Sequence, residues 1–235
     1  MAAAAIAIAF GYGLTLVAIL ARRRLGRLWL WAAVAAGAIA FPLAVRLITP
    51  IQLLLASIFR WDMDAYSTSL RAGLVGAVVT ASVNEVFKLA AALLVVLRDK
   101  DDEDTLAVGA ASGAGFAVVG ASQVIRLALF TRALPIGSSS GFVASLTQQF
   151  AFVAVHTALT ASAAFGVTRR GAGVYLIGAI LCEGLFNALG LLFALHVFAS
   201  LTWTLLSAGF GVLLLAYAFL LSLSPAPAGH PPSAP

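Results

Sequence analysis

The amino-acid sequence predicts an all-α membrane protein, a polytopic bundle of about seven transmembrane helices. Of its 235 residues, 62% are hydrophobic and only 10% are charged, whereas soluble domains have about 45–50% apolar and about 25% charged residues. A soluble globule cannot bury this much apolar surface, so most of it must face lipid. A bilayer core of about 30 Å needs roughly 20 apolar residues per helix, and seven segments of about that length use almost the whole chain.

These seven segments are joined by short loops, so residues 1–223 are expected to form a single transmembrane domain. The predicted spans are residues 2–20, 28–48, 72–97, 105–130, 142–167, 174–198 and 203–223. Pro42 interrupts the second span, and the apolar run at residues 51–59 is too short to cross. We therefore expect an interfacial or re-entrant segment there. Residues 134–141 have the Pro, Gly and Ser content of a loop, and the Pro- and Ala-rich residues 224–235 predict a disordered tail.

The basic residues predict the orientation of the bundle. The loops after the first, third and fifth spans carry eight Lys and Arg residues, while the opposite side has Arg60, with Arg71 and Arg132 at span edges. Because Lys and Arg gather in cytoplasmic loops, the N-terminus is expected outside and the C-terminus in the cytoplasm of a prokaryotic plasma membrane. The net charge of +5 thus reflects membrane topology, and we expect membrane lipid rather than nucleic acid as a partner.

Two acids lie inside the predicted spans. Of nine acids, only Glu85 and Glu183 are not in loops, and ionisable residues at this depth usually face the bundle interior and mark function. At 1.5 Å per residue, Glu85, His156 and Glu183 all lie roughly 14–20 Å from the cytoplasmic ends of their helices. Three ionisable groups on three helices at one depth predict a single buried polar cluster.

Other polar residues accompany these three at helical spacing, where side chains three or four residues apart share a face. They are Asn84 and Lys88 beside Glu85, Asn187 beside Glu183, Thr160 beside His156, and Gln123 beside Arg126 in the fourth span. By contrast, the glycine-rich residues 112–116 are expected to serve close packing of helices.

The residues by themselves leave three chemistries open. A buried carboxylate can activate water for peptide hydrolysis while a histidine or amide stabilises the oxyanion. Glu85, His156 and Glu183 would alternatively hold Zn²⁺ with one open position, although no His-Glu-x-x-His motif is present. Buried Glu and His residues also relay protons or ions.

Four short motifs resemble the PrsW and YhfC intramembrane protease families of the CAAX-protease and bacteriocin-processing clan. They are Asn84-Glu-Val-Phe-Lys88, Gly113-Ala-Gly-Phe116, His156-Thr-Ala-Leu-Thr160 and Cys182-Glu-Gly-Leu-Phe-Asn187. The similarity in order and spacing covers about residues 72–195. It implies a glutamate-dependent intramembrane peptidase that cleaves a membrane-embedded or membrane-proximal peptide bond.

The resemblance implies a role for each matching residue. Glu85 would be the base, with Lys88 at the family's basic position, and His156 and Asn187 would stabilise the oxyanion. Glu183, which stands where the family has histidine, would be a second acid or a ligand. The chain also departs from the family where Asn84 replaces a glutamate and where Gly120 and Ala121 replace a Glu-Asn pair.

The same motifs also resemble a non-catalytic branch of the clan, the anterior-pharynx-defective scaffold subunit of gamma-secretase. This similarity implies an alternative, a pseudoprotease scaffold that binds other membrane proteins. A peptidase would need water and a lateral route for a substrate helix at the cluster, whereas a scaffold would have a closed, dry Glu85–Lys88 pair. A small transporter or proton relay is the third hypothesis. A transporter would need broken half-helices, for which only Pro42 is a sign.

Overall fold

The computed structural model describes residues 2–96, 102–130, 139–169 and 171–224, and it contains helices and no strand within these ranges. The elements are α1 (Ala2–Leu20), the 3₁₀ turn η1 (Arg22–Arg24), α2 (Leu28–Phe59), α3 (Ala65–Thr68), α4 (Leu70–Val96), α5 (Asp102–Phe130), α6 (Ser139–Thr168), α7 (Ala172–Ala194) and α8 (Ser200–Ser222). In the described part of the chain, six helices are long and apolar enough to cross a bilayer, namely α2 and α4 to α8. This confirms a multi-pass helical membrane protein, while the seventh span over residues 2–20 and the orientation of the termini stay predictions.

Helices α5 and α6 form the centre of the bundle. In their most apolar stretches, 72% of α5 and 83% of α6 are buried, compared with 22% for both α7 and α8. Their close packing depends on two glycines of α5, because a Cβ on Gly109 or Gly113 would overlap the backbone carbonyl oxygens of Thr160 and His156 on α6. Small residues thus bring the two backbones together, as they commonly do in membranes.

Helix α2 corrects the predicted second span. It is one helix of 32 residues that continues through Pro42 and Pro50, so the expected break and the separate segment at residues 51–59 are wrong. Each proline removes one backbone hydrogen bond, but a helix satisfies its remaining backbone groups without water. The Thr49 hydroxyl also donates to the carbonyl of Val45. At about 1.5 Å per residue the helix is about 48 Å long, which is longer than a bilayer core is thick.

The end of α2 folds back onto the start of α4. Arg60 ends the helix in the left-handed conformation with φ of 54°, and the Trp61 ring then stacks on Phe59 at 4.7 Å between centroids. The Tyr66 hydroxyl of α3 donates to the carbonyl of Gln52 at 2.8 Å. These contacts fix the turn that directs α4 back along α2.

Most other helix boundaries differ from the sequence prediction by one to four residues, including the start of α6 and the end of α7. The predicted loop at residues 134–141 is helical from Ser139 onward, because α6 begins there. Helix α7 ends at Ala194 and not at residue 198, since His196 takes a positive φ of 59° that an α-helix does not accommodate. The predicted tail lies outside the described residues except for Ser224.

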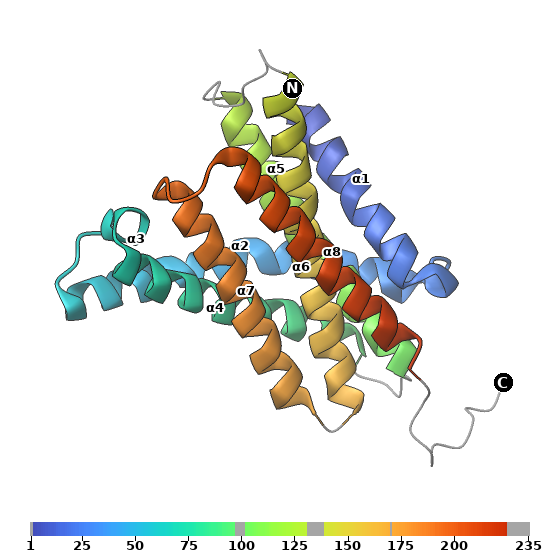
Figure 1. The fold of residues 1–235 in the computed structure, drawn as a ribbon. Helices are drawn as coiled ribbons and strands as arrows, with labels where there is room; N and C mark the ends of the chain where they lie inside the picture. Colours follow the sequence, from blue (N-terminus) through green and yellow to red (C-terminus); the bar gives the residue numbers. More distant parts are fainter. Residues whose placement is uncertain (1, 97–101, 131–138, 170, 225–235) are drawn as a thin grey trace.

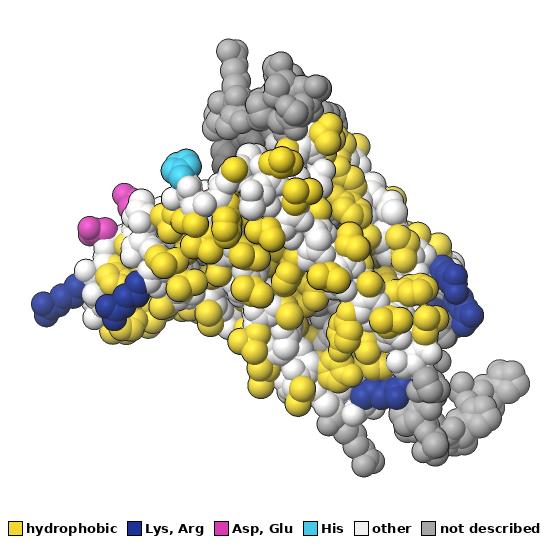
Figure 2. Space-filling view, in the orientation of Figure 1, with side chains coloured by type: hydrophobic (Ala, Val, Ile, Leu, Met, Phe, Trp, Pro, Cys, Tyr) yellow, Lys and Arg dark blue, Asp and Glu magenta, His cyan; other side chains and the backbone are white. Residues whose placement is uncertain are grey.

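The arrangement of charged side chains agrees with a membrane protein. Figure 1 shows α2 and α4 running along each other, with α3 at one end, while α1, α5, α6 and α8 cross them obliquely. In Figure 2 hydrophobic side chains cover most of the visible face, and the charged side chains lie at its edges.

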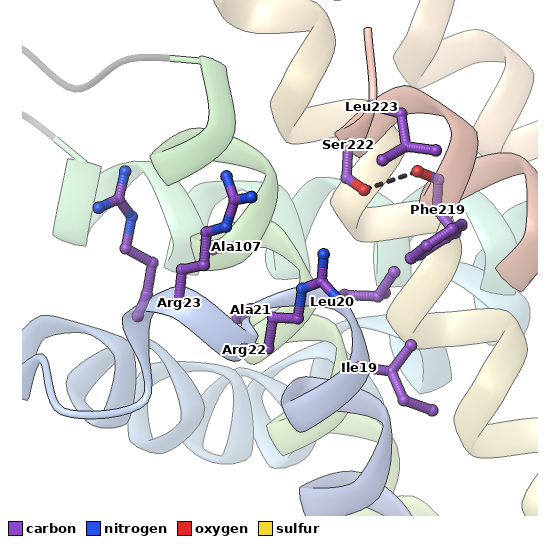
Figure 3. A pocket seen from close by; sticks show the side chains of 10 residues that line it. Ile19, Leu20, Ala21, Arg22, Arg23, Ala107, Phe219, Ser222 and Leu223 are labelled. Atoms are coloured by element: carbon purple, nitrogen blue, oxygen red, sulfur yellow. Dashed lines mark hydrogen bonds between the residues drawn. The ribbon is translucent and has the colours of Figure 1, made fainter.

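One edge is formed by the arginines of η1 and the neighbouring ends of α5 and α8. Figure 3 shows Arg22 and Arg23 near Phe219 and Ser222 of α8, around a cavity of about 40 Å³. Arg24 pairs with Asp104 at the start of α5, with 2.6 Å between Nε and Oδ1. This ion pair ties the end of α1 to the central helix.

Candidate functional site

The structure brings five of the predicted residues into one buried cluster, with Asn84 bonded to Glu183 at its side. Glu85 and Lys88 come from α4, His156 from α6 and Glu183 from α7, and these three helices pack against one another. The side chains of Glu85, Lys88 and Glu183 are 0% exposed and that of His156 is 1% exposed. We call these four residues, together with Asn84, the polar cluster.

The ammonium group of Lys88 is the centre of the polar cluster. Its Nζ lies 2.7 Å from Glu85 Oε1, 2.8 Å from His156 Nδ1 and 2.8 Å from Glu183 Oε2. An ammonium group has three donors and accepts none, so each of its protons has one partner and Nδ1 of His156 must accept. The ring of His156 therefore carries its proton on Nε2.

Glu183 is the most completely bonded acid of the cluster. Its Oε1 accepts from the Asn84 amide at 2.7 Å, and its Oε2 accepts from Lys88. The same Oε2 lies 3.3 Å from His156 Nδ1. Both oxygens of Glu183 thus accept from α4, and the link from Glu183 to the histidine of α6 runs through the Lys88 ammonium.

Two buried polar atoms near these residues have no hydrogen-bond partner in the described part of the chain. They are Oε2 of Glu85 and Nδ2 of Asn187. Since buried polar atoms are normally paired, each such atom needs an explanation. Oε2 of Glu85 is an acceptor, which is the type of group that a base requires. Nδ2 of Asn187 is a donor, which is the type of group that stabilises an oxyanion.

Aromatic rings of α5 and α6 and a serine of α5 support the polar cluster. The rings of Phe116 and Phe152 lie 5.6 and 4.3 Å from the His156 ring, centroid to centroid, and Lys88 Nζ lies 5.4 Å from the centre of Phe116. The Ser112 hydroxyl donates to the backbone carbonyl of Lys88 at 2.8 Å. Sequence reasoning missed Phe152. It expected residues 112–116 to serve helix packing, and it used residues 113–116 as a family motif without giving them a role in the cluster. The sequence feature that could have identified Ser112 is its hydroxyl, which is the lone polar group on a helix face of Gly and Ala residues.

The remaining predicted residues lie outside the polar cluster. The Thr160 hydroxyl donates to the carbonyl of His156, one turn earlier on its own helix, and so stabilises α6 locally. Gln123 is exposed on α5 and makes no hydrogen bond to the cluster. Asn187 lies one turn beyond Glu183 on α7 and is half-buried.

A zinc ion does not fit the polar cluster while Lys88 is in place. Glu85, His156 and Glu183 do offer ligand atoms within 4.8 Å of one another, a spacing that suits a metal. However, zinc would sit about 2.0–2.2 Å from each ligand, in the space that the Lys88 ammonium fills with contacts of 2.7–2.8 Å to the same three side chains. We therefore assign no chemical step to zinc.

A groove lies beside the helices that carry His156 and Glu183, and no residue of the polar cluster lines it. It lies between α6, α7 and α8 and has a volume of about 570 Å³. Leu159 and Cys182 are on its wall, and Cys182 directly precedes Glu183 in α7. The groove thus reaches the helix segments that carry His156 and Glu183, although the cluster itself is sealed.

Comparisons with known proteins add no relative: no protein-family model, curated protein or solved structure matches this chain.

Proposed function

We propose that this protein is an intramembrane peptidase of the PrsW and YhfC type, with Glu85 as the base that activates water. The observation that supports it most directly is the state of Glu85, because Lys88 holds Oε1 at 2.7 Å while Oε2 is buried without a partner. A carboxylate held on one oxygen keeps the other available to accept a proton from a water molecule.

Two donors are suited to the developing oxyanion. The amide of Asn187 has an unpaired Nδ2, and His156 carries its proton on Nε2 because Nδ1 accepts from Lys88. Donors fixed before the reaction stabilise a developing negative charge most effectively. Glu183 has both oxygens bonded, so its role in this proposal is to position Lys88 and Asn84.

The groove between α6, α7 and α8 supplies the lateral route that a transmembrane substrate needs. Its volume of about 570 Å³ and its place beside Cys182 suit one end of a membrane-embedded peptide. In this proposal the substrate enters from the lipid and displaces the side chains that now seal the polar cluster.

The experiment compares peptide cleavage by wild type and Glu85→Gln, both reconstituted in nanodiscs with a panel of single-span substrates. Loss of a catalytic base typically lowers the rate by about 10²–10⁴-fold, and we expect a loss in this range. Asp64→Asn is the matched acid-to-amide control, since Asp64 is exposed near α3, and it should retain wild-type turnover. Equal cleavage by wild type and Glu85→Gln, or none by either, would contradict the proposal.

A second candidate is the pseudoprotease scaffold, which the closure of the polar cluster favours. All three protons of Lys88 are bonded, and the side chains of Glu85 and Lys88 are 0% exposed, which matches the closed, dry pair expected of a scaffold. Under this reading no substrate of the panel is cut, while substitutions in the cluster still lower stability. The transporter hypothesis has less support, because α2 runs unbroken through Pro42.

A further inference from the structure

The geometry points to a latent divalent-cation site in the polar cluster, formed by Glu85, His156 and Glu183, in which the Lys88 ammonium takes the place of the ion. The native protein therefore binds no metal there, and removing the lysine side chain creates a metal site. This inference does not depend on the proposed function, since it concerns metal content and not cleavage.

The ligand set is that of a metal site in its composition and spacing. One imidazole nitrogen and two carboxylate oxygens lie within 4.8 Å of one another, and all three residues are buried. Three protein ligands of this kind with an open fourth position are typical of zinc sites, and cobalt accepts the same donors. The ligands come from α4, α6 and α7, so the bundle itself holds them together.

The Lys88 ammonium lies where an ion would bind. Its Nζ is 2.7–2.8 Å from all three ligand side chains, so the two cations exclude each other. The ring proton of His156 is also placed as in a metal site, because Nδ1 faces the cation and Nε2 carries the hydrogen. The ammonium thus satisfies the same lone pairs that a metal would use.

The charges of the polar cluster explain why the vacated site would take up an ion. Two carboxylates with one ammonium have a formal charge of −1, and without Lys88 the charge falls to −2 in a sealed interior. Uncompensated buried charge is strongly unfavourable. A divalent cation would bring the formal charge to zero, and the three ligand atoms would move inward from their 2.7–2.8 Å contacts with the ammonium to the shorter distance of about 2.0–2.2 Å that zinc requires.

Neighbouring groups keep two of the three ligands, Glu183 and His156, in position when Lys88 is shortened. Asn84 donates to Glu183 Oε1 at 2.7 Å, and the rings of Phe116 and Phe152 lie against His156. Such outer contacts orient the ligands of metal sites. Substituting Lys88 by alanine therefore removes the resident cation and leaves three ligands and space for an ion.

The test measures metal content. Wild type, Lys88→Ala and the double variant Lys88→Ala/Glu183→Gln are purified in detergent, incubated with Zn²⁺ or Co²⁺, dialysed and analysed by mass spectrometry of the elements. We expect about one ion per chain in Lys88→Ala, with the visible absorption of four-coordinate Co²⁺, and no ion above background in wild type. The double variant lacks one ligand and should lose most of the bound metal.

Two results would overturn the inference. One is wild type that retains zinc stoichiometrically after dialysis, because the ammonium and the ion cannot share the site. The other concerns Lys88→Ala that is helical and monodisperse. If this variant binds no ion, or binds only as much metal as the double variant, the inference is wrong. Where Lys88→Ala does not fold without metal, it is prepared in the presence of Zn²⁺, and failure of zinc to rescue its folding counts against the site.

Discussion

Lys88 makes three contacts that no other residue of the polar cluster could make. Its ammonium joins α4 to α6 and α7 through Glu85, His156 and Glu183. Removing one partner of a buried ion pair costs about 3–5 kcal/mol, because the remaining charge stays buried and unpaired. The stability of the bundle should therefore depend on this lysine more than on either acid that it binds.

At the residue scale, Lys88→Met is expected to lower the free energy of unfolding by about 3–5 kcal/mol. Methionine keeps most of the length of the side chain but leaves two carboxylates without a cation. Thermal unfolding in detergent, without added metal, measures the effect. Adding Glu85→Gln and Glu183→Gln to Lys88→Met removes both unpaired charges and should recover part of the loss. A melting temperature of Lys88→Met equal to that of wild type would contradict this prediction.

At the scale of elements, glycines set the distance between the helices that carry the site. A Cβ on Gly37 of α2 would overlap the Ser112 carbonyl of α5, and a Cβ on Gly115 of α5 would overlap the Val34 carbonyl of α2. The two backbones touch at this crossing. It also holds α5 in place where Ser112 donates to Lys88, so the crossing positions the polar cluster indirectly.

Gly37→Ala is therefore expected to destabilise the protein, although alanine is normally the better helix former by about 1 kcal/mol. The matched control is Gly209→Ala in α8, where no neighbouring atom lies within 4 Å of the added Cβ. We expect a lower melting temperature for Gly37→Ala and an unchanged or higher one for Gly209→Ala. Equal melting temperatures for the two variants would show that the α2–α5 crossing tolerates the added methyl group.

At the scale of the whole molecule, the two ends of the bundle differ in charge. One end carries the arginines of η1 with Arg27, and the other carries Arg60, Asp62 and Asp64 at the turn after α2. The greater number of basic residues in the loops at the first end predicts that it faces the cytoplasm.

Cysteine labelling tests this orientation. In a Cys182→Ser background, Asp62→Cys and Arg27→Cys each place one thiol at an exposed position, on opposite ends of α2. A maleimide that does not cross membranes should label Asp62→Cys in intact cells and Arg27→Cys only after permeabilisation. The reverse pattern would contradict the predicted topology.

Most of the helical architecture could be predicted because lipid leaves an apolar segment few alternatives. Each long apolar run must form its own backbone hydrogen bonds, so length and composition sufficed to find the long described helices, although not the short α3 or the full length of α2. The same physics explains why the predicted separation of residues 51–59 from the second span was wrong, since α2 continues through Pro50. In water a proline usually ends a helix, but α2 stays helical through it because a break would expose further backbone groups to an apolar solvent.

The amino-acid sequence by itself determined that this is a multi-pass helical protein and that Glu85, His156 and Glu183 share one depth, because both follow from hydrophobic length and the rise of a helix. Only the tertiary structure decided that Lys88 lies between all three and leaves Oε2 of Glu85 without a partner. Those contacts join residues 68 and 95 positions apart. Their geometry depends on how closely α4, α6 and α7 approach and on which faces they turn toward each other, and helical periodicity within one segment does not contain that information.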